Sequence, residues 1–218
     1  MENTKIDTEL SATSQPTQFT ELVDLVKVIV QTMALVLIIR WSLLEPFKIP
    51  STSMVPTLVV GDHILVNKLS YGFWLPFPYR QFSAFNYAEP KRGDIVVFTL
   101  PDDPETKDNE ARINIIKRVM GLPGEKIEVR GTKVFINDVP IADSWSHWVH
   151  GGEKDFGPVI IPEKHVLMLG DNRDASRDSR FWTNPFLPID RIKGRAFMIY
   201  WNSEISWDNL KRIFKIIR

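Results

Sequence analysis

An apolar segment near the start of the sequence constrains the fold of this chain more than any other feature. The stretch Val28–Ile39 is twelve residues without a charge, and widening it to residues 25–44 gives twenty residues. Twenty helical residues are about 30 Å long, which matches the hydrocarbon core of a bilayer if Lys27 and Arg40 reach the two interfaces. We therefore expect a transmembrane anchor over residues 25–45. A buried helix of a soluble protein is the alternative, because the twelve uncharged residues alone are too short to span a bilayer.

The flanks of this segment support an anchor that stays attached to the protein. Trp41 lies where an interfacial aromatic residue is expected, and Pro46 ends the helix. Residues 1–24 are mostly polar and are expected to form a disordered tail. The stretch has no basic leader region and no small-residue cleavage site, so it does not read as a cleaved signal peptide. Orientation is left open by a tie in basic residues between the two sides, Lys5 and Lys27 against Arg40 and Lys48.

After the anchor, the pattern changes to short β-strands over residues 46–204. Apolar residues alternate in short segments separated by Gly, Pro and Asn-Asp turns, and no helical period longer than about ten residues occurs between 50 and 200. We expect a mainly β fold, an antiparallel partly open barrel or two packed sheets, with a small inserted β subdomain at about 130–163. The expected strands are His63–Val66, Asp94–Leu100, Lys126–Val129, Val134–Ile136, His165–Leu169 and Ala196–Trp201.

Composition excludes several kinds of chemistry. The chain has no cysteine, which removes disulfides, thiol nucleophiles and cysteine-ligated metals. It has 27 basic and 27 acidic residues, so bulk charge does not favour nucleic acid as a partner. His147 and His150 lack the frame of a zinc site and are expected in a surface loop. The aspartate-containing segment 170–180 does not fit a calcium loop, because glycine and glutamate are missing at the required positions. We therefore expect neither a metal nor a cofactor.

Serine and lysine are the remaining candidates for catalysis. Ser51 and Ser53 follow the anchor and, on an extended segment, would point to the same side. Lys117 follows two β-branched residues on an expected half-buried strand. A Pro-bounded turn and a lysine that reaches solvent are the structural alternatives. If Lys117 is buried, desolvation lowers its pKa, and a neutral lysine can take the proton of a serine nucleophile.

The order of the motifs makes the interpretation specific. The anchor is followed by PFKIPSTSMVPTLVVGDHILVNK, KRGDIVVF at 91–98, IIKRVMGLPGEKIEV at 115–129 and GDNRDASRDSR at 170–180. This series resembles the bacterial type I signal peptidases, the leader peptidase family, from about residue 25 to 201. Thr52 and Ala175 depart from the family pattern, at positions where Gly and Asn are common, without removing a catalytic group.

The resemblance implies a role for each matching residue. Ser53 corresponds to the nucleophile, Lys117 to the general base, and Ser51 to an oxyanion-hole residue that acts together with the Ser53 backbone N–H. Ser176 corresponds to the serine that orients the lysine. Structural support is implied for the charged residues of the last motif, which are Asp171, Arg173, Asp178 and Arg180.

The resemblance also implies a substrate and a location. The expected activity is a membrane-bound serine endopeptidase that removes signal peptides from secreted preproteins and cuts after small residues. Its partners would be the signal peptide, the lipid bilayer and the secretion translocon, with the catalytic body on the outer side of a single-pass cytoplasmic-membrane protein. Small-residue pockets are implied at Phe47, Ile49, Pro50, Met54, Leu58, Ile64, Ile115 and Ile116, and core packing is the structural alternative for each apolar residue.

Three alternatives to this function remain open. A self-cleaving repressor would share the Ser–Lys pair, but such proteins carry a DNA-binding domain where this chain has the apolar segment. A membrane-tethered binding module and an accessory subunit of a translocon would both leave Ser53 and Lys117 without a catalytic role.

The C-terminal tail, residues 205–218, is apolar on one helical face and basic on the other. Its spacing predicts a short amphipathic helix on the membrane surface. The alternatives are that the same apolar face packs against the β core or that the end frays.

Overall fold

The computed structural model describes residues 18–77, 80–86, 88–100, 114–152, 155–204 and 206–217, of which residues 18, 38–42, 73–77 and 80–86 are described by their backbone alone. One part addressed by the sequence analysis, the tail over residues 1–17, lies outside the described residues. Two compact units, residues 1–39 and 40–218, are considered separately.

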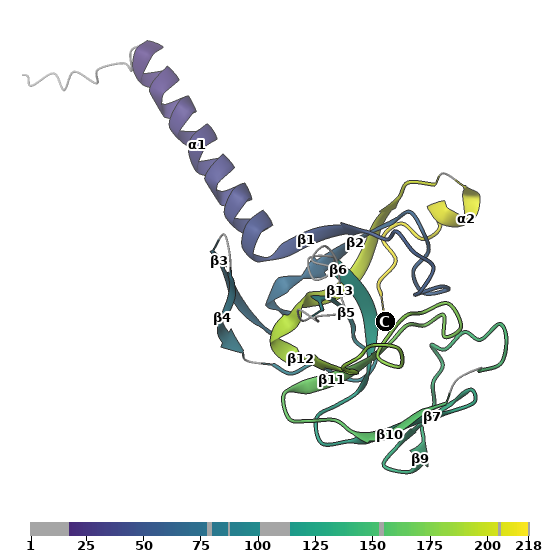
Figure 1. The fold of residues 1–218 in the computed structure, drawn as a ribbon. Coiled ribbons are helices and arrows are strands. Elements are labelled where there is room, and N and C mark those ends of the chain that lie inside the picture. The colour runs from purple at the N-terminus through teal and green to yellow at the C-terminus, as the bar shows by residue number, and fades with distance from the viewer. Residues whose placement is uncertain are drawn as a thin grey trace, which may run out of the picture. The chain divides into compact units, whose positions relative to one another are not determined.

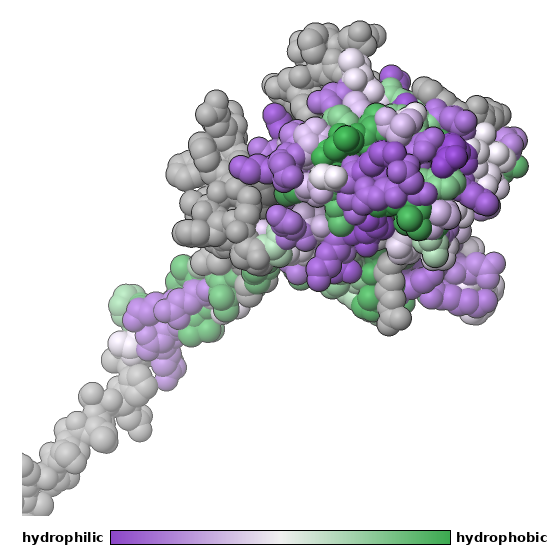
Figure 2. Space-filling model, turned by 90° about the horizontal axis from the view of Figure 1, so that it is seen from below, coloured by the Kyte–Doolittle hydropathy of each residue, from purple (hydrophilic) through white to green (hydrophobic). Residues whose placement is uncertain are grey.

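The first unit contains helix α1, Gln18–Ser42. The helix starts earlier than the predicted anchor, because residues 18–24 contain no Gly or Pro that would stop it and Glu21 stabilises its first turn. Residues 18–24, which the prediction placed in the polar tail, are therefore helical. Apolar side chains such as Leu25 and Val30 are more than half exposed, and Figure 2 shows apolar residues at the surface of this unit. Over the described residues, no helix combines the length and the apolar character needed to cross a membrane.

The second unit is built on a seven-stranded sheet in which every neighbouring pair is antiparallel. The mainly β, antiparallel prediction is confirmed, and Figure 1 shows the sheet curled into an open half-barrel. From one edge to the other, the strands are β1 (Leu44–Lys48), β2 (Asp62–Asn67), β13 (Ile192–Asn202), β5 (Ile95–Thr99), β6 (Asn114–Gly121), β11 (His165–Leu169) and β12 (Phe186–Pro188). Two 3₁₀ turns, η1 (Lys68–Ser70) and η2 (Ile189–Arg191), follow β2 and β12.

The centre of this sheet is buried on both faces. Along β5, Ile95 and Val97 belong to one core cluster, whereas Val96 and Phe98 belong to another. A strand covered on both sides reads as a continuous apolar run, which explains the IVVF sequence. Strand β6 pairs with β5 so that Lys117 lies opposite Val96, and this register places the lysine in the middle of the sheet.

The inserted subdomain is a separate four-stranded sheet between β6 and β11. Its strands are, in order, β10 (Phe156–Ile160), β7 (Lys126–Arg130), β8 (Lys133–Ile136) and β9 (Val139–Pro140). They pack on a core cluster that also contains Met120 of β6 and Leu167 and Leu169 of β11. The insertion begins at Lys126, earlier than the predicted 130, because β7 pairs with β8 and β10 and not with the main sheet. The predicted turn at Asn137-Asp138 is present, with φ of 49° and 68°.

The remaining described elements are a hairpin and the C-terminal segment. Strands β3 (Gly72–Phe77) and β4 (Arg80–Asn86) form a two-stranded hairpin that the sequence analysis did not predict. The C-terminal helix prediction is wrong, because helix α2 covers only Trp207–Leu210. The chain then turns at Phe214, with φ of 62°, and Ile217 pairs with β13 and is buried in the core. Core packing therefore competes successfully with helix formation here.

Candidate active site

Ser53 and Lys117 lie together at a buried point of the second unit. The Nζ of Lys117 is 2.8 Å from Ser53 Oγ, and it also donates to Ile116 O at 2.9 Å. The side chains come from different places, since Ser53 is in the turn after β1 and Lys117 is on β6. Only 7% of Ser53 and 5% of Lys117 is exposed. A serine hydroxyl and a lysine amine are thus in direct contact away from bulk water.

The turn that carries Ser53 is held by backbone hydrogen bonds. Val55 N donates to Thr52 O, and Asn172 N donates to Ser53 O at 3.1 Å. Ser51 Oγ lies 3.4 Å from Ser53 Oγ. The two hydroxyls converge as expected, but the reason differs from the prediction, because residues 51–57 form turns and bends and not an extended strand.

Burial makes Lys117 a usable base near neutral pH. Desolvation lowers the pKa of Lys117 to about 8, and the carboxylates of Asp178 and Asp171 act in the opposite direction. At a pKa of about 8, roughly a tenth of the lysine is neutral at pH 7. A neutral amine within hydrogen-bonding distance of a serine hydroxyl can accept its proton.

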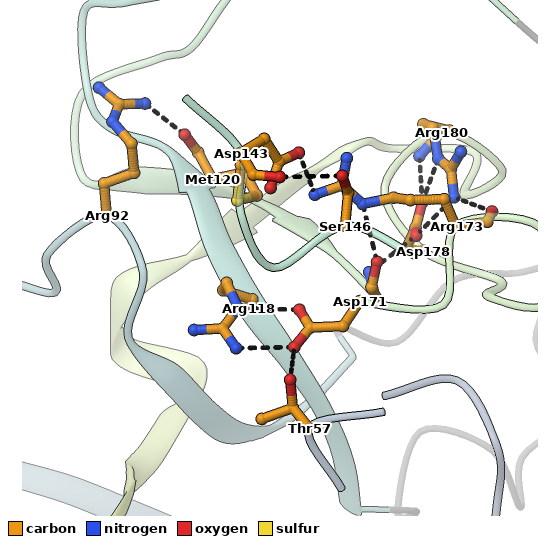
Figure 3. Close-up of polar contacts among 11 residues, drawn as sticks. Thr57, Arg92, Arg118, Met120, Asp143, Ser146, Asp171, Arg173, Asp178 and Arg180 are labelled. Carbon is orange, nitrogen blue, oxygen red and sulfur yellow. Dashed lines mark hydrogen bonds and ion pairs between the residues drawn. The ribbon is translucent and has the colours of Figure 1, made fainter. Parts of the chain in front are cut away.

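A buried ion pair connects the strand of Lys117 to the turn of Ser53. Arg118, the neighbour of Lys117, donates from Nε and Nη2 to the two carboxylate oxygens of Asp171, at 2.8 and 2.6 Å. Thr57 Oγ1 donates to the same carboxylate at 2.5 Å. Figure 3 shows Arg118 and Thr57 converging on Asp171. Since the Arg118 and Asp171 side chains are both fully buried, this pair fixes the spacing between β6 and the nucleophile turn.

Comparison with known proteins adds an independent observation. The family described as "Signal peptidase, peptidase S26" matches residues 22–201. The chain belongs to this signal peptidase family. A signal peptidase I of Pseudomonas fluorescens is 35% identical over 225 residues, covering 87% of this chain and 75% of the relative. A signal peptidase I of Leptolyngbya laminosa is 36% identical over 190 residues, covering 87% and 85%. A crystal structure of a signal peptidase I from Enterococcus faecalis aligns with 50% of this chain and 97% of its own, with 27% identity and a TM-score of 0.39.

These matches confirm the resemblance drawn from the sequence motifs. The protein is a serine endopeptidase of the signal peptidase family, and its activity is the removal of signal peptides.

The charged residues of the last motif form a second buried network in this signal peptidase. Arg180 Nε donates to Asp178 Oδ1 at 2.8 Å, and Asp178 Oδ2 also accepts a hydrogen bond from Gly170 N. Arg173 pairs with Asp143 of the inserted subdomain at 2.6 Å, and burial lowers the pKa of Arg173. Asp171 pairs with Arg118 and not with Arg173. These pairs, which Figure 3 shows, therefore join three segments of the chain, at residue 118, at residue 143 and at residues 170–180.

Ser176 does not make the contact that the resemblance implied. Its side chain is buried next to Gly170, where an added Cβ would lie 2.5 Å from both Ser176 Cβ and Ser53 O. Among the described residues, Ser176 Oγ has no hydrogen-bond partner, so no bond to Lys117 is present. Lys117 instead donates to the Ile116 carbonyl.

Most of the implied pocket residues are core residues. Five of them are buried in one core cluster, where they pack against Val66, Ile95 and Ala196, so the prediction that they line an open pocket is wrong. These residues are Ile49, Met54, Leu58, Ile64 and Ile116. Phe47 and Ile115 are half-buried, and Pro50 is exposed. Only these three retain surface that a substrate can touch without rearrangement.

The sequence analysis missed several residues that build the site. Arg118 and Thr57 hold Asp171, and Asn172 binds the backbone of the nucleophile turn. Arg118 stands directly beside Lys117, but nothing local predicts its pairing with a residue 53 positions away. The sequence does contain one signal for a buried ion pair: Arg118 stands beside Lys117 on a strand whose other residues are mostly apolar.

Proposed function

We propose that this signal peptidase cleaves its substrate with Ser53 as nucleophile and Lys117 as general base. The observation that carries the proposal is the 2.8 Å contact between Lys117 Nζ and Ser53 Oγ at a buried site where the pKa of the lysine is low. Ser53 Oγ attacks the scissile carbonyl while its proton moves to Lys117. The developing oxyanion accepts hydrogen bonds from the Ser53 N–H and from Ser51 Oγ.

The second half of the reaction uses the same lysine in reverse. Protonated Lys117 gives its proton to the leaving amine as the peptide bond breaks, which leaves the signal peptide as an ester on Ser53. Water then attacks the ester, Lys117 accepts the proton from that water, and Ser53 Oγ is released with a proton. Atoms and charge balance without a metal or another cofactor.

We propose that the substrate binds as an extended strand and is cut after a small residue. Strand β1 is an edge of the described sheet, pairing there with β2, and it leads within a few residues to Ser53. An exposed edge offers unpaired backbone groups to an added strand. The half-buried Phe47 and Ile115 would limit the size of side chains next to the cut, which favours residues such as Ala.

We also propose that residues 25–44 anchor the protein in a lipid bilayer, with the catalytic body on the outer side of the cytoplasmic membrane. The uncharged, mostly apolar run Val28–Ile39 and the exposed apolar side chains of α1 support this. The anchor would hold the site at the surface where a preprotein leaves the secretion translocon. The absence of cysteine allows a direct test. A single cysteine replacing exposed Lys133 should react with an impermeant maleimide in intact cells, and one replacing Glu21 should react only after lysis.

The catalytic roles are tested by cleavage of a purified preprotein with a small residue before the cut. Ser53→Ala and Lys117→Ala should each lose processing, while both variants keep their thermal melting transition. Lys117→Arg should also be inactive, because arginine does not lose its proton in a protein. Lys133→Ala removes an exposed lysine of β8 and should process at the wild-type rate. Normal processing by either dyad variant would refute these roles.

A further inference from the structure

The segment between β9 and β10 of the inserted subdomain covers the buried ion pair at the candidate active site. We call residues 143–152 the tryptophan segment. His147 N donates to Asp171 O at 2.7 Å, and Arg173 N donates to His147 O at 2.9 Å. Asp143 forms the ion pair with Arg173. The tryptophan segment is therefore bound to the 170–180 loop by backbone hydrogen bonds and by a side-chain ion pair.

Trp145 is the residue of this segment that reaches the ion pair itself. The Arg118 guanidinium lies over the Trp145 ring, 4.7 Å from the centroid. The edges of the guanidinium are occupied by Asp171 and by the carbonyl of Gly93, at 2.6 Å, so the indole covers an open face. Gly93 adopts φ of +94°, and a Cβ there would lie 3.0 Å from Trp145 Cζ2. The absence of a side chain at Gly93 is what allows the ring to pack this closely.

The position of Arg118 determines that of both catalytic residues. Along β6, Arg118 adjoins Lys117, so the backbone of the base moves with it. Through Asp171, Arg118 is connected to Thr57 in the nucleophile turn. The next residue, Asn172, donates its N–H to Ser53 O. A shift of Arg118 away from Trp145 would therefore loosen the contact between nucleophile and base.

We propose that Trp145 is a positioning residue for the Ser–Lys dyad and that it acts through Arg118. The proposal rests on the proposed function of Ser53 and Lys117. The indole face attracts the guanidinium and excludes water from it, and exclusion of water strengthens the Arg118–Asp171 pair. Without the indole, a cavity or water would replace an aromatic contact, and the pair would lose both packing and electrostatic strength.

The same geometry links Trp145 to the charge on Lys117. Among the described residues, two carboxylates act on Lys117, those of Asp171 and Asp178, and each is paired with an arginine, Arg118 or Arg180. A weaker Arg118–Asp171 pair leaves more of the Asp171 charge to favour protonated lysine. Loss of the indole should therefore move the midpoint of the pH–rate profile to higher pH.

The test compares Trp145→Ala with Trp145→Phe in the full chain, using a purified preprotein in detergent micelles. Phenylalanine keeps an aromatic face, so Trp145→Phe should stay within about 2-fold of wild type in turnover. Trp145→Ala should lose about 10-fold in turnover, with a small change in KM and a higher pH midpoint. Val149→Ala is the matched control, because the Val149 side chain in the same segment is 62% exposed.

Three outcomes would overturn the proposal. One is a folded Trp145→Ala with wild-type turnover and pH midpoint, and another is Trp145→Phe as impaired as Trp145→Ala. The third is a fall in melting temperature with unchanged turnover per folded molecule and an unchanged midpoint, which would make the role of Trp145 purely structural. Failure of the proposed function gives a different result, because Ser53→Ala would then remain active whatever residue occupies position 145.

Discussion

Replacing Lys117 by methionine should stabilise the protein at neutral pH while abolishing its activity. Burial lowers the pKa of Lys117 from 10.5 to about 8, a difference that corresponds to about 3 kcal/mol. Because the folded-state pKa is below that of the unfolded chain, this cost is fully present below pH 8. It decreases as the pH rises towards 10.5 and is absent above that value. Methionine has a similar length and carries no charge, so it removes the cost without leaving a large cavity.

The net gain at pH 7 is smaller than the full cost of charge burial. Lys117 also donates hydrogen bonds to Ser53 and Ile116, and their loss subtracts about 1 kcal/mol each. The net gain should therefore be about 1 to 2 kcal/mol at pH 7. Between pH 7 and pH 10 it should fall by about 2 to 3 kcal/mol, so that Lys117→Met becomes neutral or slightly destabilising at pH 10.

The assay is denaturant-induced unfolding of wild type and Lys117→Met at pH 7 and pH 10, in the same detergent. Lys133→Met serves as the control because it replaces an exposed lysine of β8 by the same side chain. The measured quantity is the change with pH in the stability difference between each variant and wild type. An equal difference at both pH values for Lys117→Met would refute the argument that a buried charge on Lys117 opposes folding.

Three further substitutions test the surroundings of the dyad. Arg212→Ala removes an ion pair to the fully buried carboxylate of Asp62 and should lower stability by about 2 kcal/mol, measured by thermal unfolding; an unchanged transition would contradict this. Ser176→Ala should leave turnover close to that of wild type, because Ser176 Oγ makes no hydrogen bond to Lys117, and a large loss of turnover in a folded variant would contradict this. Gly170→Ala should abolish activity, because its Cβ would lie 2.5 Å from Ser53 O, and a preprotein cleaved at the wild-type rate would contradict this.

Several strands, and the two residues of the candidate dyad, could be proposed from the sequence because their signals are local. Strand β11 has the predicted bounds, His165–Leu169, since an apolar run between turn residues specifies a short buried strand. Ser53 and Lys117 lie in contiguous motifs whose order identified the family. By contrast, β1, β12 and the β3–β4 hairpin were missed, because short edge strands and irregular hairpins carry little periodic signal.

The contacts that hold the site together depend on pairing across the chain. The Arg118–Asp171 and Asp143–Arg173 pairs join segments whose proximity follows from strand register and not from local sequence. The C-terminal tail is a further example. Its apolar residues have the spacing of an amphipathic helix, but the chain leaves the helix after Leu210 and Ile217 pairs with β13. Apolar residues near Ser53 were assigned to a pocket through the resemblance, and a matching apolar residue in a motif does not show whether its side chain packs in the core or lines a groove.

The pH dependence of single-turnover cleavage tests most directly whether neutral Lys117 activates Ser53. With a pKa of about 8, the neutral fraction rises about 10-fold between pH 7 and pH 9 and then levels off. The account predicts that the cleavage rate of a preprotein follows this curve, with its midpoint near pH 8. A lysine with its ordinary pKa would instead give a rise of about 100-fold over the same interval without a plateau. That result, or a flat profile with chemistry rate-limiting, would contradict the account.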